Sequence, residues 1–225
     1  MISKTIIDFL TLLKENNNRE WFAENRKLYD IAKTEFENTV KKLIPRIAEF
    51  DKSIGLQEPK DCIFRIYRDT RFSHDKTPYK SNFGAYFSRG GKNGGYAGYY
   101  FNLEPASIFL SGGLYLPMPN ILKSVRTEIF ENPQEFKKII STPDFKKLFG
   151  EVWYGDSEKE KLKTAPKGFP KDFELIEILK YKNFVTWHNV SDKIVLSSDF
   201  EDYAINIFKS TFQFNSFLNR AVEHA

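Results

Sequence analysis

Charged and aromatic side chains concentrate between Phe64 and Lys80, in the stretch FRIYRDTRFSHDKTPYK. Five cations stand there against two carboxylates, a local excess of three positive charges. The cations are Arg65, Arg68, Arg71, Lys76 and Lys80, and the carboxylates are Asp69 and Asp75. Arginine binds phosphate or carboxylate through two parallel hydrogen bonds, and lysine adds a mobile point charge. The stretch therefore predicts an anion site with aromatic walls.

Side-chain alternation divides these cations. A strand over 62–69 would place Arg65 on one face and Arg68 on the other. Arg68 would then lie on the apolar face and need a carboxylate partner, so an internal salt bridge is as well supported as ligand contact for Arg68 and Asp69. Ligand contact is favoured for the remaining cations, which are Arg65, Arg71, Lys76 and Lys80.

The end of the stretch allows two local structures. Thr77 is a good N-cap and Pro78 a favoured first helical residue, so a short helical turn here would present free amides to an anion. A plain turn that closes the loop fits equally well. Tyr79 is a candidate ligand contact that could stack on a base or sugar, although packing is the more usual role of such a tyrosine.

Three carboxylates are candidates for catalysis. Glu104 follows Asn102 at strand spacing, so the two side chains would share a face as a general base and its orienting partner. Asp69 and Asp75 are the other two, but no pair of carboxylates is arranged as an acid and a base. Ser-His-Asp at 73–75 is contiguous, whereas a catalytic triad converges from separate segments. Whether the protein is an enzyme stays open.

The sequence predicts no metal site and no cofactor. Its three histidines and one cysteine lack HExxH or paired-cysteine spacing. The glycine-rich run at 90–95 lacks the spacing and following helix of a phosphate-binding loop, and it is interpreted as a hairpin connection. Cys62 is expected to be a buried, unreactive thiol.

Strands are expected in the middle of the chain and helices on both sides. Glycine-broken aromatic runs predict antiparallel strands near 62–69, 82–88, 96–103 and 107–112, with a further strand near 184–190. Helical spacing precedes and follows them. This separation of helices from strands predicts an α+β fold in which a sheet of four to five strands packs against helices from both termini.

The start of the second predicted helix is a secondary candidate site. Asn17 and Glu20 have the spacing of a capping box, and Pro45 is expected to kink or divide the helix that follows. Polar and aromatic side chains gather at this start, where an anion could dock, although capping and packing account for most of them. The secondary candidates are Arg19, Trp21 and Arg26.

Composition sets the outer bounds. The 225 residues, 41% of them hydrophobic, fit a single domain over 1–225, and no apolar run is long enough to span a bilayer. One cysteine excludes an internal disulfide and points to the cytoplasm. A formal charge of +4 is too small to establish nucleic-acid binding. The oligomeric state is left open.

Further motifs extend over nearly the whole chain. They are NNNREWF at 16–22, GYYFNLEP at 98–105, SGGLYLP at 111–117, and APKGF and LKYKNF near 165–184. Together with the stretch at 64–80 they resemble a bacterial family with fungal members, called domain of unknown function 2461. The resemblance implies one domain of this length and no established activity, so no functional residue follows from it.

Three functional hypotheses remain. The first is a binding protein for an anionic, phosphorylated ligand, a nucleotide or a nucleic-acid backbone, held by the cations and Tyr79 of the stretch at 64–80. The second is an enzyme that acts on a phosphorylated or carboxylated small molecule with a carboxylate as acid or base. The third is a scaffold in which internal salt bridges use up the cations. Open cations at a cleft would favour the first two.

Overall fold

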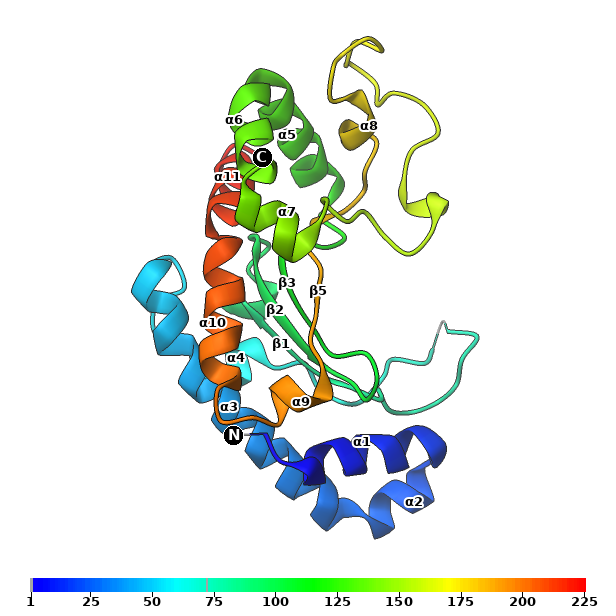
Figure 1. Ribbon diagram of the computed structural model, residues 1–225. Helices are drawn as coiled ribbons and strands as arrows, with labels where there is room; N and C mark the ends of the chain where they lie inside the picture. The colour runs from blue at the N-terminus through cyan, green and yellow to red at the C-terminus, as the bar shows by residue number, and fades with distance from the viewer. Residues whose placement is uncertain (1, 72) are drawn as a thin grey trace.

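The middle of the chain forms an antiparallel sheet in the order β1-β2-β3-β4, with β5 also paired to β3 (Figure 1). The structure is a computed structural model that describes residues 2–71 and 73–225. Its strands are β1 (Phe83–Phe87), β2 (Gly98–Leu103), β3 (Phe109–Leu114), β4 (Phe184–Val185) and β5 (His188–Asn189). Helices pack on one face of this sheet and around its ends (Figure 1), which confirms the predicted α+β fold, and β4 and β5 confirm the late strand near 184–190.

One face of the sheet forms the core. Tyr99 and Phe101 of β2 are fully buried, and their rings pack on Phe208 and Phe200 at centroid distances of 5.5 and 5.1 Å. Both partners belong to α10 (Phe200–Ser210), which continues into α11 (Phe212–Glu223) along the same face (Figure 1). Alternation along the strands therefore supplies the apolar surface that these helices cover.

The amino-terminal helices pack beside the sheet. They are α1 (Lys4–Glu15), α2 (Arg19–Glu24) and α3 (Arg26–Phe50). The side chain of Asn18 accepts from the N–H of Trp21 at 2.9 Å and so caps α2, which corrects the expected cap at Asn17. The expected division at Pro45 is also wrong, because α3 continues through it. Ile44 and Ile47 are buried on either side of the proline, and this packing outweighs the lost backbone hydrogen bond.

The first predicted strand is mostly replaced by other structure. Pro59 starts a helical turn, α4 (Pro59–Cys62), in which Glu58 and Asp61 form a capping box. The chain then makes only isolated bridges, one between Ile63 and Ala85 of β1 and another farther along. The capping box therefore makes Cys62 helical. Beyond it the alternation persists without a regular strand, because Ile66 is buried between the exposed Arg65 and Tyr67.

Most of the remaining helices lie around the end of the sheet away from α1, but α9 (Asp192–Val195) lies near α1 (Figure 1). The others are α5 (Pro119–Glu131), α6 (Pro133–Ile140), α7 (Pro143–Phe149) and α8 (Ile176–Leu179). The first three begin with proline, which suits the first turn of a helix. Across the described part of the chain, no helix has the length and apolar character needed to cross a membrane.

Candidate functional site

A short antiparallel pairing closes the loop over 69–77. The Arg68 N–H donates to the Pro78 carbonyl at 2.9 Å, and the Lys80 N–H donates to the Ile66 carbonyl at 2.8 Å. The chain on both sides of the loop is thus extended and paired. Neither the helical turn nor the plain turn expected at Thr77 is present, because Tyr79 forms an antiparallel bridge with Tyr67 and the segment is extended.

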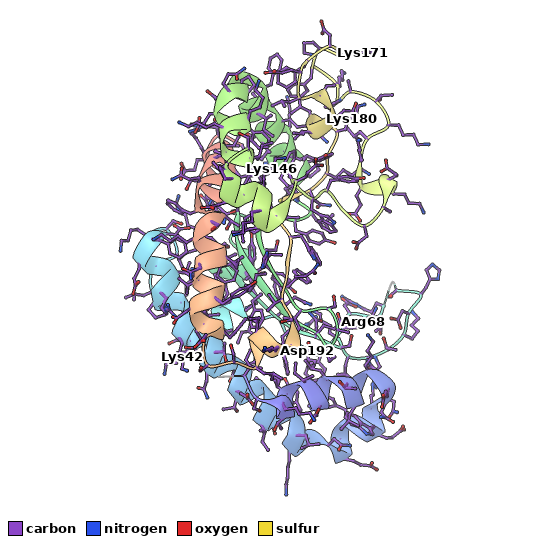
Figure 2. The ribbon with its side chains drawn as sticks, viewed as in Figure 1. Lys42, Arg68, Lys146, Lys171, Lys180 and Asp192 are labelled. Atoms are coloured by element: carbon purple, nitrogen blue, oxygen red, sulfur yellow. The ribbon has the colours of Figure 1, made fainter. Side chains whose placement is uncertain are left out.

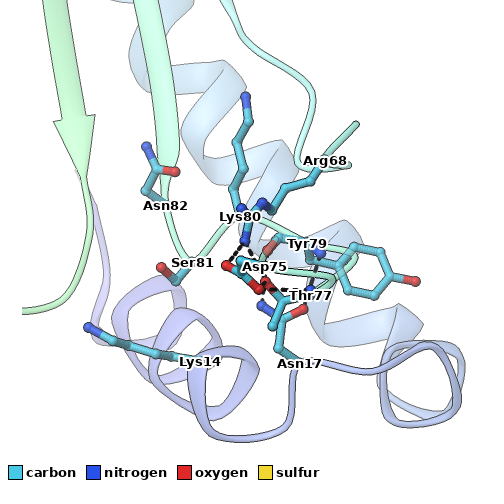
Figure 3. A pocket seen from close by; sticks show the side chains of 9 residues that line it. All are labelled: Lys14, Asn17, Arg68, Asp75, Thr77, Tyr79, Lys80, Ser81 and Asn82. Atoms are coloured by element: carbon cyan, nitrogen blue, oxygen red, sulfur yellow. Dashed lines mark hydrogen bonds and ion pairs between the residues drawn. The ribbon is translucent and has the colours of Figure 1, made fainter. Parts of the chain in front are cut away.

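An open pocket of about 350 Å³ lies at the foot of this loop (Figure 3). Its wall combines the end of α1, the polar run after it, the loop and the residues just before β1. The lining residues are Lys14, Asn17, Arg68, Asp75, Thr77, Tyr79, Lys80, Ser81 and Asn82. Three of these carry a positive charge and one a negative charge, so the pocket is polar and net positive.

Asp75 and Thr77 hold Arg68 at the pocket. The Arg68 guanidinium donates to the carboxylate of Asp75 and to the hydroxyl of Thr77. Asp75 also accepts from the N–H of Thr77 at 2.9 Å and from its hydroxyl at 2.8 Å. These bonds, the one from Arg68 foremost, lower the pKa of Asp75 to about 2. Asp75 is therefore ionised at neutral pH and orients Arg68 instead of carrying a proton.

Lys80 is the pocket cation without a carboxylate partner among the described residues. Burial lowers the pKa of its half-buried side chain, and the charges of Arg65 and Arg68 lower it further. Its ammonium lies 5.4 Å from the centre of the Phe64 ring. In Figure 3 the side chain extends away from Asn17. An added anion stabilises a partly desolvated ammonium near other cations more than it stabilises an ammonium that already has a carboxylate partner.

Tyr79 contributes its backbone to the pocket wall and its ring to the core. The ring stacks on Phe22 of α2 at a centroid distance of 4.0 Å and an angle of 13°. Burial raises the pKa of its hydroxyl. The side chain of Asn17 donates to the Tyr79 carbonyl at 2.9 Å and accepts from its N–H at 3.1 Å. The Tyr79 ring, which the sequence suggested could stack on a base or sugar, is therefore packed against Phe22 instead.

The other three predicted cations do not line the pocket. The Arg71 guanidinium makes two hydrogen bonds to the Asp69 carboxylate, at 3.0 and 2.7 Å, and these lower the pKa of Asp69. The ammonium of Lys76 donates to a carbonyl of its own loop at 2.9 Å. Arg65 is exposed beside the pocket. The pocket thus brings together Arg68 and Lys80 from the cations of 64–80, and adds Lys14 from α1.

Glu104 is the candidate carboxylate that touches two pocket residues. It accepts from the Ser81 hydroxyl at 2.8 Å and lies 3.7 Å from the Lys14 ammonium. Asn102, two residues earlier, is buried and accepts from the amide of Asn82 at 2.7 Å. The shared face expected for Glu104 and Asn102 thus places both behind the wall formed by Ser81 and Asn82.

The secondary candidates around α2 lie outside the pocket lining. Trp21 stacks on Phe9 at 6.3 Å, and Arg26 forms an ion pair with Asp30 at 3.0 Å. Arg19 is exposed on α2. Packing and a helix-surface ion pair therefore account for Trp21 and Arg26.

The sequence analysis did not single out Lys14, Ser81 and Asn82 of the lining, and it named Asn17 and Thr77 only for local capping. Ser81 and Asn82 directly follow the stretch at 64–80, so extending that motif by two residues would have included them. Lys14 carries no such signal, because a lysine on the polar side of an amphipathic helix is ordinary.

Other reactive groups give no second site. Burial raises the pKa of the Cys62 thiol to about 12, which makes this side chain a poor nucleophile. Over residues 2–71 and 73–225, no three His, Cys, Asp or Glu side chains are grouped closely enough to hold a metal ion.

The chain belongs to the DUF2461 family of conserved hypothetical proteins, whose family model matches residues 5–217. This match spans both the pocket and the sheet. No curated protein and no solved structure matches the chain significantly. The functional assignment therefore depends on the pocket itself.

Proposed function

We propose that the protein binds an anionic, phosphorylated ligand in the pocket at the foot of the loop over 69–77. Lys80 carries this proposal, since it is a half-buried pocket cation with no carboxylate partner in the described chain. Arg68 is a second ligand group, already oriented by Asp75 and still 28% exposed. A bound phosphate would accept from both side chains, and such charge-assisted hydrogen bonds are stronger than neutral ones.

The surrounding charges favour an anion over a cation or a neutral sugar. Lys14 adds a third positive charge, although Glu104 lies 3.7 Å from it and offsets part of its effect. The positive charges of Arg65 and Arg68 act on Lys80, and a phosphate at this point would relieve that repulsion. Binding should therefore weaken as salt concentration rises.

An enzymatic role is the second candidate, supported by the contact of Glu104 with Ser81. In that case Lys80 and Arg68 would hold the substrate phosphate, and Glu104 would take a proton through or beside the Ser81 hydroxyl. Asp69 and Asp75 are poorer bases, because their arginine partners lower both pKa values. Glu104→Gln would then abolish turnover of a bound substrate while leaving its binding nearly intact.

The test of ligand binding is a thermal-shift and calorimetric screen of inorganic phosphate, sugar phosphates and nucleotides. A ligand that prefers the folded protein raises its unfolding temperature. Lys80→Gln should weaken binding of a hit by about tenfold or more, because it removes a charge-assisted hydrogen bond.

Lys76→Gln is the matched control, since it removes the same charge from the same motif at a residue outside the pocket lining. It should change affinity by less than about threefold. Equal losses of ligand affinity in both variants would show that binding depends only on the overall positive charge of the motif. Absence of any binding to phosphorylated compounds would refute the proposed function.

A further inference from the structure

A row of five aromatic rings crosses the sheet on the face opposite the core. Phe64 lies 6.3 Å from Tyr100, which lies 5.7 Å from Phe109. Phe109 stacks on Trp187 at 3.6 Å, and Trp187 lies 5.1 Å from Trp153. Five separate chain segments thus supply one continuous row.

This row is distinct from the hydrophobic core. Its five residues are all partly buried, and none of them belongs to the core or to the described residues packed against it. Strand pairing explains the separation. Tyr100 is opposite Ser111, whereas its core-facing neighbours Tyr99 and Phe101 are opposite Gly112 and Leu110. Because successive side chains alternate, the row occupies the other face.

Among the described residues, no helix covers the row in the way that α10 and α11 cover the core face (Figure 1). The segment that carries Arg68 and the one that carries Lys171 and Lys180 both project on the side of the sheet away from α10 (Figure 2). Partly exposed aromatic rings on a sheet face flanked in this way are suited to receive a flat apolar group.

Lys80 joins the row to the phosphate pocket. Its ammonium lies 5.4 Å from the centre of the Phe64 ring, which begins the row. The phenol of Tyr100 lies 3.2 Å from the Asn102 amide oxygen, which also accepts from the pocket residue Asn82. Lys80 thus places a positive charge at the Phe64 end of the aromatic surface, and the matching ligand is anionic at one end and aromatic at the other.

We infer that the ligand is a nucleoside phosphate, with its phosphate at Lys80 and Arg68 and its base against the ring row near Phe64 and Tyr100. This inference depends on the proposed phosphate site. A mononucleotide fits better than a nucleic-acid strand, because Lys80 meets the row at its Phe64 end and phosphates repeated along a strand would need cations along its length.

The experiment compares a nucleoside 5′-monophosphate with ribose 5-phosphate by calorimetry on the full chain. The nucleotide should bind at least about fivefold more tightly, because stacking of a base on an aromatic side chain adds affinity. Phe64→Leu should remove most of this advantage and leave ribose 5-phosphate binding within about twofold. Phe130→Leu, at an aromatic residue on α5 that is 36% exposed, is the matched control and should leave both affinities unchanged.

The outcomes separate the two proposals. If ribose 5-phosphate binds and the base adds nothing, the phosphate site stands and the nucleotide inference is overturned. If neither compound nor inorganic phosphate binds, the proposed function fails together with the inference. Binding of an oligonucleotide without binding of the mononucleotide would also overturn the nucleotide inference. The nucleotide inference is supported if the nucleotide binds more tightly than ribose 5-phosphate, and if Phe64→Leu abolishes this difference while Phe130→Leu preserves it.

Discussion

The ring of Tyr79 stacks on that of Phe22 at 4.0 Å, and this contact anchors the end of the cationic motif in the amino-terminal helices. Tyr79 is 6% exposed and immediately precedes Lys80. The lysine that we assign to the ligand is therefore adjacent to one of the firmly packed residues of the fold.

Tyr79→Ala should lower the free energy of unfolding by roughly 3–4 kcal/mol, since it deletes a buried aromatic ring and leaves a cavity against Phe22. Urea unfolding followed by circular dichroism measures this loss. Tyr67→Ala is the comparison, because Tyr67 is 43% exposed and should cost roughly 1 kcal/mol or less. A similar small loss at both positions would contradict the packing role of Tyr79.

Asn17→Ala should destabilise the protein by roughly 1–3 kcal/mol, because it leaves the N–H and carbonyl of Tyr79 without their side-chain partner. It should also weaken phosphate binding by moving Lys80. Asn16→Ala removes only a bond to the carbonyl of Leu12 in the same helix and should change stability by less than about 0.5 kcal/mol. Denaturant titration of both variants tests the difference.

The contribution of Asp75 should disappear in acid. Its pKa falls from the ordinary 3.8 to about 2 in the folded protein, so its stabilising effect is complete above pH 4 and is lost as the pH falls through 2. The difference in unfolding free energy between the wild type and Asp75→Asn should therefore be constant from pH 7 to pH 4 and shrink below it. A carboxyl resonance of Asp75 that titrates near pH 4 would contradict this.

Gly84 and Tyr100 should be energetically coupled. A Cβ atom at Gly84 would lie 2.5 Å from the Tyr100 hydroxyl oxygen, so Gly84→Ala should displace that ring and cost roughly 1–3 kcal/mol. In a Tyr100→Phe background, which removes the clashing oxygen, the same change should cost at least about 0.5 kcal/mol less. A double-mutant cycle by urea unfolding measures the coupling, and strictly additive effects would argue against the close approach.

The sheet and most helices were accessible from sequence because they depend on local periodicity and composition. The functional role of the stretch at 64–80 stays a prediction. Alternation at β2 and helical spacing in α5 and α10 predicted real elements. The division expected at Pro45 is absent, because buried residues on either side of it keep α3 continuous. Asn18 and not Asn17 caps α2, a difference of one residue that decides which asparagine is left to bind Tyr79.

The composition of the pocket was not accessible in the same way. The sequence favoured Arg65, Arg71 and Lys76 over Arg68, since a strand over 62–69 would have turned Arg68 toward the apolar side. In the structure the loop over 69–77 folds back, and Asp75 meets Arg68 at the pocket. Lys14 joins from a helix far away in sequence, and only the tertiary packing of α1 reveals it.

The two hydrogen bonds between the Asn17 side chain and the Tyr79 backbone link residues 62 positions apart in the chain. A peptide that copied only the stretch at 64–80 would keep five cations and lose the partner that fixes their spacing. Transplanting the stretch at 64–80 to another scaffold would consequently require the turn between α1 and α2 to be transplanted with it.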